Sequence, residues 1–269
     1  MAKITVSSRF GLDIRDINFS YLYDANSFTS TSTLFRANYG GGAADEFRGT
    51  GFRYNSQGEP IAGTITSYAG LSGSTKVFAL ESFSLAATKI VAAARTTSTA
   101  DDVKLMASVL SGNDTFKGGN ATDFIRMYAG NDTILGNGGN DSLYGGSGND
   151  KITGGAGRDK LYGESGSDTF IFKSRADSTV SSSGRDTIYD FTSADTIDLA
   201  GIDANTNISG NQGFSFIGTK AFTGRSGDLR YEKKASDTYI YGDVNGDKVA
   251  DFAIHLDDAV TLYKSDFIL

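Results

Sequence analysis

The sequence predicts an all-β protein whose centre is a parallel β-roll, a solenoid in which short strands stack coil on coil. Three observations favour this fold: aspartate recurs every nine residues, an apolar residue follows two positions after each aspartate, and glycine fills most of the turns. The aspartates are Asp114, Asp123, Asp132, Asp141, Asp150, Asp159 and Asp168, and the apolar residues are Phe116, Ile125, Ile134, Leu143, Ile152, Leu161 and Phe170. A fixed internal period of this kind is typical of repeat architectures.

Each nonapeptide within residues 109–171 divides into a six-residue turn and a three-residue strand. The segments 145–153 and 154–162 fit the pattern GGxGxDxUx best, where U is apolar. Glycine permits the φ values of tight turns, and one apolar side chain per strand points inward. Two nonapeptides form one coil. Aspartates eighteen residues apart, such as Asp132 and Asp150, are therefore expected on the same edge, and those of the alternate repeats on the other edge.

These rows of aspartates predict a divalent cation between the coils. Carboxylates stacked at a strand spacing of about 4.8 Å repel by roughly 3 kcal/mol at an effective dielectric near 20. Calcium reverses that sign, because it accepts six to eight oxygens from carboxylates and backbone carbonyls, whereas magnesium demands a tighter octahedron. The candidate ligands are the seven aspartates and the turn residues Asn137, Gly139, Gly146, Gly148, Gly155 and Gly157, with up to five sites between same-edge aspartates.

Two other interpretations of this segment stay open, a flexible linker and a β-solenoid that needs no metal. The strict phase of both the aspartate and the apolar position disfavours the linker. The nonapeptide resembles the calcium-binding repeat of RTX (haemolysin-type) proteins.

Composition limits the classes of function. The formal net charge of −7 and the pI of about 4.8 argue against nucleic acid as a partner. No cysteine is present, so neither disulfides nor cysteine metal sites are expected. Residues 1–20 contain no apolar core of a signal peptide, and no apolar run approaches the length of a membrane span.

The nine-residue phase continues beyond Asp168 with Asp177, Asp186 and Asp195, although glycine mostly disappears there. We expect the roll to run into a capping β segment, with a weaker case for calcium at these three aspartates. From about Gly163 the chain also resembles the C-terminal domain of serralysin-type secreted metalloproteases. The residues that carry this resemblance are 166–170, 185–191, 195–199 and 243–247.

The serralysin resemblance implies a β-roll and β cap that carry a type I secretion signal. In that family the signal ends in an acidic residue followed by three hydrophobic ones, and this chain ends Asp266, Phe267, Ile268, Leu269. The implied partner is the type I secretion machinery, and the implied location is outside a Gram-negative bacterium, secreted or at the cell surface. Extracellular polysaccharide or a cell surface is a further candidate partner.

An additional calcium site is a candidate in the C-terminal region. Asp243, Asn245, Asp247 and Asp251 resemble part of an EF-hand loop, with the first three as candidate ligands, but Ile254 stands where a full loop has glutamate. The alternative is a β-hairpin between 238–242 and 249–255 that turns at Asn245 and Gly246. The two interpretations are compatible.

Residues 1–96 predict a small β domain of unknown role, or an extension of the solenoid. Strands are expected at 33–38, 46–54, 63–68 and 76–83. A helical linker or cap follows at 97–108, with Ser98 as N-cap and Val103, Met106 and Leu110 on one face. An earlier helix is expected at 85–94, and either helix could cover the open end of the roll. The C-terminal cap is assigned to 172–269.

No catalytic residue is assigned, and enzymatic activity stays open. Zinc proteolysis is excluded because the chain has no HExxH motif and a single histidine, His255, which we interpret as structural. The main hypothesis is a secreted calcium-binding protein that acts at a surface, in a matrix or in adhesion. The alternative is a small polysaccharide lyase or epimerase that uses Asp45, Glu46, Glu59 or Glu81. A membrane-active toxin is disfavoured, because no strongly amphipathic segment is visible.

Overall fold

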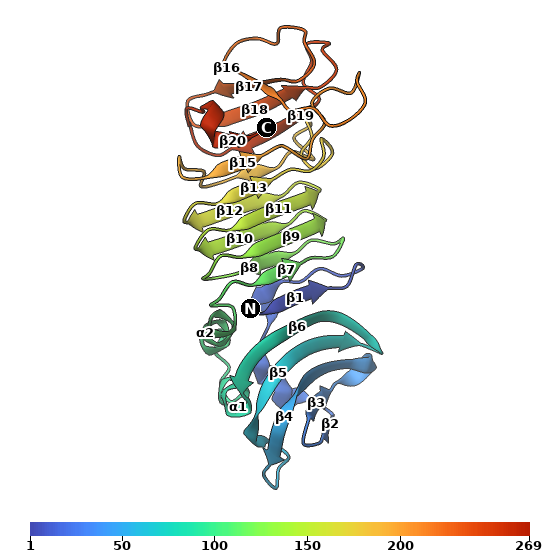
Figure 1. The fold of residues 1–269 in the computed structure, drawn as a ribbon. Helices are drawn as coiled ribbons and strands as arrows, with labels where there is room; N and C mark the ends of the chain where they lie inside the picture. Colours follow the sequence, from blue (N-terminus) through green and yellow to red (C-terminus); the bar gives the residue numbers. More distant parts are fainter.

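The computed structural model describes residues 1–269 as an elongated stack of strands (Figure 1). Two sheets run along the stack. The first contains twelve strands: β1 (Lys3–Val6), β2 (Ser27–Ser30), β3 (Leu34–Asn38), β4 (Ala43–Tyr54), β5 (Pro60–Ser72), β6 (Thr75–Ala86), β7 (Thr115–Lys117), β9 (Thr133–Gly138), β11 (Lys151–Ala156), β13 (Thr169–Ile171), β15 (Thr196–Asp198) and β20 (Phe267–Ile268). The second contains eight: β8 (Phe124–Arg126), β10 (Ser142–Ser147), β12 (Lys160–Ser165), β14 (Thr187–Ile188), β16 (Ser215–Gly218), β17 (Asp228–Lys233), β18 (Thr238–Asp243) and β19 (Phe252–Leu256).

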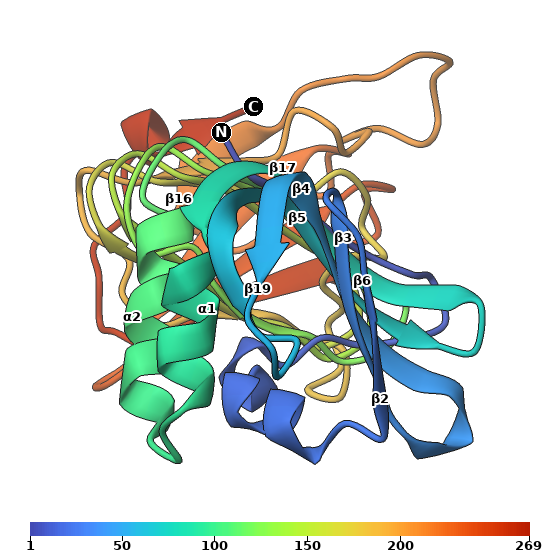
Figure 2. The same cartoon turned by 90° about the horizontal axis from the view of Figure 1, so that it is seen from below.

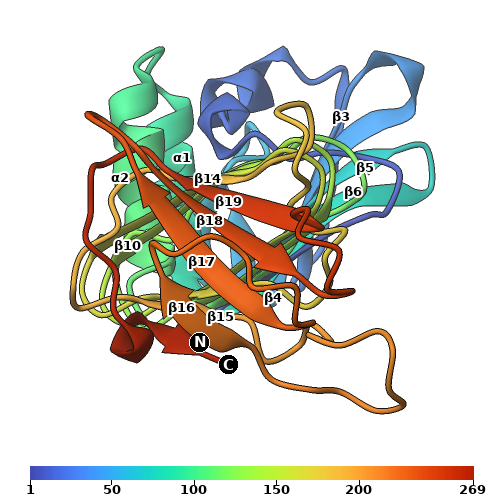
Figure 3. The same cartoon turned by 90° about the horizontal axis from the view of Figure 1, so that it is seen from above.

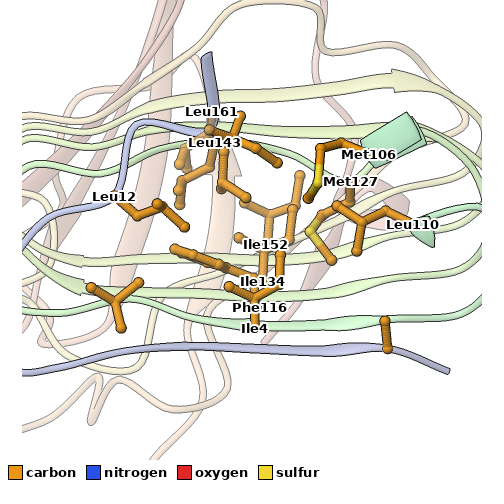
Figure 4. Close-up of a cluster of buried hydrophobic side chains, with 14 of the residues drawn as sticks. Ile4, Leu12, Met106, Leu110, Phe116, Met127, Ile134, Leu143, Ile152 and Leu161 are labelled. Carbon is orange, nitrogen blue, oxygen red and sulfur yellow. The ribbon is translucent and has the colours of Figure 1, made fainter. Parts of the chain in front are cut away.

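The central part is a parallel β-roll, as the sequence predicts. Strands β7 to β13 alternate between the two sheets, and each pairs in parallel with the strand one coil away. The partners are eighteen residues apart, as in Ile134 with Ile152 and Leu143 with Leu161. All seven apolar residues of the repeat are fully buried, and each is paired with the one eighteen residues away. Figure 4 shows Phe116, Ile134, Leu143, Ile152 and Leu161 inside the roll.

The coils change length after Asp168 while keeping the nine-residue phase. Thr169 pairs with Thr196, and Lys160 pairs with Thr187, so the partners are now twenty-seven residues apart. Both spans contain the same loop between β13 and β14, which lengthens the chain there by one nonapeptide. The apolar positions Ile188 and Ile197 remain fully buried, as expected for a continuation of the roll.

The N-terminal segment forms one more coil beneath the repeats. Strand β1 pairs in parallel with β7, placing Ile4 beside Phe116. On the other sheet, Asp13 forms a parallel bridge with Phe124. We call residues 2–14 the N-terminal coil. Because β1 also pairs antiparallel with β6, this coil joins the roll to the N-terminal sheet.

The N-terminal region is an antiparallel sheet of β2 to β6, continuous with the roll. Strands β4 to β6 cover their predicted ranges, and β3 begins one residue later than predicted, at Leu34. Helices α1 (Ala87–Ala94) and α2 (Thr99–Val109) lie side by side against this region (Figure 2). Ser98 caps α2 as predicted. The predicted apolar face is wrong at Val103, which is 45% exposed. The buried face instead carries Asp102, Leu105 and Met106, because α2 packs against β6 and α1.

The C-terminal strands close the far end of the roll (Figure 3). Strands β17, β18 and β19 form an antiparallel meander, and β19 joins the roll in parallel with β14. The predicted hairpin is present as β18 and β19, with Gly246 at a φ of 81° in the turn. None of the helices is both long and apolar enough to span a membrane.

Candidate metal centre

The predicted aspartates form a hydrogen-bonded ladder along each edge of the roll. On one edge the backbone N–H of each aspartate donates to Oδ1 of the next, one coil onward. These bonds measure 2.7 Å from Asp114 to Asp132, 2.7 Å from Asp132 to Asp150, 2.8 Å from Asp150 to Asp168 and 2.8 Å from Asp168 to Asp195. The structure therefore brings together the same-edge residues that the eighteen-residue spacing predicts.

The other edge repeats the arrangement with the alternate aspartates. Bonds of 2.8 Å run from the N–H of Asp123 to Asp141, from Asp141 to Asp159 and from Asp159 to Asp186. Asp186 and Asp195 thus extend the two ladders, a role that their phase indicated but that the loss of glycine obscured. Asp177 keeps the phase without joining a ladder, since its carboxylate accepts hydrogen bonds from the nearby backbone of Lys173 and Ser174.

Each ladder aspartate uses one oxygen for the ladder, and in most of them the other oxygen has no partner. The Oδ2 atoms of Asp114, Asp132, Asp141, Asp150, Asp159 and Asp186 are buried and accept no hydrogen bond. A buried carboxylate oxygen without a donor is costly, because desolvation is not compensated. A cation with oxygen ligands would remove that cost, so the residues present fit a bound calcium ion.

Burial shifts the titration of these carboxylates. It raises the pKa of Asp132 to about 7 and that of Asp141 to about 8, and the same-edge neighbours add to both shifts by repulsion. Burial likewise raises the pKa of Asp159 and of Asp168 to about 6. The cause is the low polarity of the site, which disfavours the charged form.

Glycine opens five of the seven repeats and leaves room for the oxygens of Asp123, Asp141, Asp150, Asp159 and Asp168, whereas Val109 and Met127 open the other two. A Cβ atom at Gly145 would overlap Oδ2 of Asp150, and one at Gly154 would overlap Oδ2 of Asp159. The candidate turn ligands all adopt positive φ and lie in stacked turns: Asn137, Gly139, Gly146, Gly148, Gly155 and Gly157. Their backbone carbonyls and the aspartate oxygens belong to the same two edges of the roll.

The N-terminal coil terminates both ladders without a carboxylate. The N–H of Ala2 donates to Oδ1 of Asp114, and the N–H of Leu12 donates to Oδ1 of Asp123 at 2.5 Å. The sequence left an extension of the solenoid open for residues 1–96 but did not assign it to this coil, because Ala2 and Leu12 are ten residues apart and carry no aspartate. The only signal was an isoleucine two residues after each, Ile4 and Ile14.

The weaker candidate site in the C-terminal cap is a loop held by its own backbone. The carboxylate of Asp243 accepts hydrogen bonds from the N–H groups of Gly246 and Lys248 at 2.7 and 2.9 Å. Asn245 contacts Asp247 through its side-chain amide at 3.2 Å. Neither oxygen of Asp243 is left without a donor, in contrast to the ladder aspartates.

The fold and the ladders define a calcium-binding β-roll built on nonapeptide repeats. Residues 109–134 and 135–170 match the family model of RTX calcium-binding nonapeptide repeats (4 copies). These matches cover less than a quarter of the 269 residues, so they describe the repeats and not the rest of the chain. Calcium is the ion expected of such repeats.

Two solved structures from Azotobacter vinelandii are similar over the same share of the chain. Both are subunits of the mannuronan C5-epimerase. The AlgE6R3 subunit is 27% identical, with a TM-score of 0.30, and the match covers 59% of this chain and 78% of that one. The AlgE6R2 subunit is 21% identical, with a TM-score of 0.33, and the match covers 59% and 88%. No curated protein matches the sequence.

Proposed function

We propose that this chain is a secreted calcium-binding RTX protein that folds outside the cell when calcium binds, and that it serves at a surface, in a matrix or in adhesion. The observation that carries the proposal is the set of buried Oδ2 atoms without a donor, aligned along both edges of the roll. In the metal-free roll these oxygens are desolvated and the same-edge carboxylates repel each other. Both effects destabilise the fold, and a bound cation would remove them.

The proposed ligands are the ladder aspartates together with carbonyls of the turns between them. Bound calcium supplies positive charge between successive coils. The chain supplies the rest: the N–H ladder fixes each carboxylate, and the glycine turns leave space beside it. Extracellular calcium modules typically bind at about 10⁻⁴–10⁻³ M, so the repeats would stay unfolded in a low-calcium cytosol and fold outside.

Export by a type I route is the second part of the proposal, and it rests on the C-terminal tail. Phe267 and Ile268 form β20, which pairs with β15 at the end of the roll. The carboxylate of Asp266 accepts a hydrogen bond from the N–H of Tyr263 at 2.8 Å. We propose that the secretion machinery takes the tail before the cap folds, when Phe267 and Ile268 are not yet paired with β15.

Circular dichroism during a calcium titration, with metal counting, tests the proposal. We expect metal-free protein to lack most β structure, to gain it at millimolar calcium and to lose it again with EGTA. Magnesium at the same concentration should have little effect. A fully ordered metal-free roll with the melting temperature of the calcium-loaded form would contradict the proposal.

A binding role for the N-terminal sheet is favoured by the way its carboxylates are neutralised. Glu46 accepts a hydrogen bond from Arg48 at 2.7 Å and lies 3.6 Å from Arg36, and Glu59 lies 3.0 Å from Arg95. A carboxylate paired with an arginine in this way is more suited to holding the sheet together than to transferring a proton in catalysis. Calcium-dependent binding to a glycan array or to bacterial cells would support this role, and no binding to any envelope or host surface would count against it.

One observation favours the alternative of a small polysaccharide-active enzyme. Asp45 lines a cavity of about 330 Å³ and accepts hydrogen bonds from Tyr39 and Tyr68, both at 2.8 Å. Burial raises the pKa of this carboxyl, as suits a general acid. The alternative predicts polysaccharide turnover that is lost in Asp45→Asn and kept in Glu81→Gln, which changes an exposed carboxylate.

A further inference from the structure

A second group of metal-ligating side chains lies in the C-terminal cap, apart from the aspartate ladders. His255 on β19, Asp237 before β18 and Asp257 after β19 each offer one ligand atom, and these atoms all lie within 4.8 Å of one another. Strands β18 and β19 carry or flank these residues, and β14, whose Thr187 pairs with His255, runs beside β19 at the end of the roll (Figure 3).

The register of the hairpin explains why the three side chains meet. His255 pairs with Tyr239, and Thr238 pairs with Leu256, so Asp237 and Asp257 come next to each other at the open end of the hairpin. Residues two apart in a strand share a face, which places Asp257 on the face of His255. Two carboxylates directly opposite on one face repel each other. A cation between them would reverse that repulsion.

The imidazole of His255 is held with one nitrogen towards the carboxylates. Its Nδ1 lies 3.1 Å from Oγ1 of Thr187, and its Nε2 lies 2.7 Å from Oδ1 of Asp237. The ring stacks on Tyr239 with the centroids 4.8 Å apart. A partner on the far nitrogen and a packed ring are the usual support of a metal-binding histidine.

We propose that His255, Asp237 and Asp257 bind a divalent transition metal of the zinc class, separate from calcium. One imidazole and two carboxylates provide three protein ligands, which leaves a fourth position for water. Imidazole nitrogen selects zinc-class ions over calcium, which takes oxygen ligands. The chain has no cysteine and no second histidine, so no other imidazole or thiolate competes for the ion.

The geometry requires a small adjustment. With metal–ligand bonds of about 2.0–2.2 Å, tetrahedral ligand atoms lie roughly 3.3–3.6 Å apart. Nε2 of His255 and Oδ1 of Asp237 are now hydrogen-bonded at 2.7 Å, so the partly exposed carboxylate of Asp237 must move outward. Two cations lie near the site, with Lys234 4.5 Å and Arg185 5.2 Å from the ring centre of Tyr239, and they reduce the affinity.

Zinc titration of the full chain in saturating calcium tests the site, because the calcium ladders are then occupied. We expect isothermal calorimetry at pH 8 to give one zinc ion per chain. His255→Gln and Asp257→Asn should each weaken that binding by at least the ~10- to 100-fold that loss of an outer partner of a metal ligand costs. Asp258→Asn changes the neighbouring exposed carboxylate and should leave zinc binding unchanged.

The single histidine gives an independent readout. Zinc should shift the one imidazole signal in the NMR spectrum of the calcium-loaded protein at a one-to-one ratio, and EDTA should reverse the shift. Asp257 is exposed, so Asp257→Asn tests the site without threatening the fold, and circular dichroism checks His255→Gln. An unmoved imidazole signal, or zinc binding that is equal in wild type and Asp257→Asn, would show an ordinary histidine–aspartate pair and overturn the proposal.

Discussion

The backbone N–H of Asp132 donates a 2.7 Å hydrogen bond to Oδ1 of Asp150, eighteen residues further along the chain. This single contact places two carboxylates of successive coils on the same edge of the roll. It also uses one oxygen of Asp150 and leaves the buried Oδ2 without a donor. The predictions about the ladders follow from these two roles: Oδ1 accepts the ladder hydrogen bond, and Oδ2 is left free to bind a cation.

Replacing a ladder aspartate should weaken calcium binding more than replacing an aspartate that only shares its phase. Asp141→Asn keeps a side-chain acceptor but removes a charge from the middle of one edge. Because calcium affinity follows the charge of the ligands, we expect the midpoint of calcium-induced folding to rise about tenfold. The matched control is Asp177→Asn, since Asp177 keeps the nine-residue phase outside the ladders. Equal midpoints for the two variants would contradict the ladder as the binding site.

Adding one methyl group beside a ladder oxygen should have a similar effect. In Gly154→Ala the Cβ atom would overlap Oδ2 of Asp159, so the turn must move away from the position that suits a cation. We expect fewer calcium ions bound per chain and a lower melting temperature in calcium. Gly112→Ala is the control, because a Cβ atom there meets nothing within 4 Å. Calorimetry and thermal melts measure both effects, and an unchanged ion count in Gly154→Ala would count against the close approach.

Acid should stabilise the metal-free roll. The pKa values of Asp132 and Asp141 rise to about 7 and about 8 in the fold, against about 3.9 for an unfolded aspartate. The folded state therefore holds more protons between about pH 4 and pH 8, and its stability falls as the pH rises through that window. Calcium binding requires deprotonated carboxylates, so calcium affinity should rise over the same window.

Circular dichroism of metal-free protein from pH 4 to pH 8.5 measures the first effect. Calcium titrations at pH 5.5 and pH 8 measure the second. If the β structure of the metal-free protein persists or increases as the pH rises from 6 to 8, the raised pKa values of Asp132 and Asp141 would be contradicted.

The roll could be predicted in detail because each nonapeptide carries an aspartate and a buried apolar residue at a fixed spacing. One spacing of nine residues fixed which side chains point inward, and Ile134, Leu143 and Ile152 are all fully buried. The same spacing assigned Asp141 and Asp159 to one edge. The lengthened coils were harder to predict, since Asp177 and Asp186 share a phase but only Asp186 joins a ladder. Glycine in the turn does not decide between coil and loop, because the turns before Asp177 and Asp195 both lack glycine and only Asp195 joins a ladder.

The remaining elements depend on contacts that no local pattern encodes. Met106 was assigned to the buried face of α2 correctly and Val103 wrongly, because the face is chosen by what the helix packs against. The group of Asp237, His255 and Asp257 also depends on strand register. In the sequence His255 has Asp257 two residues away but Asp237 eighteen residues away, so the spacing did not show that the three meet, and we interpreted His255 as structural.

The N-terminal coil should hold the two halves of the molecule together. Ile4 lies in β1, which pairs with β6 of the N-terminal sheet on one side and with β7 of the roll on the other, and it is 2% exposed. Ile4→Ala should therefore cost about 2–5 kcal/mol, the usual cost of emptying a buried isoleucine site. Because Phe116 of the roll and Leu80 of the N-terminal sheet both lose the side chain of their paired residue, the roll and the sheet should melt together at a lower temperature in saturating calcium. Lys3→Ala changes an exposed side chain of the same strand and should leave the melting temperature unchanged. A melt of Ile4→Ala that lowers only one of two separate transitions would show that the sheet and the roll fold independently, and that β1 belongs to one of them alone.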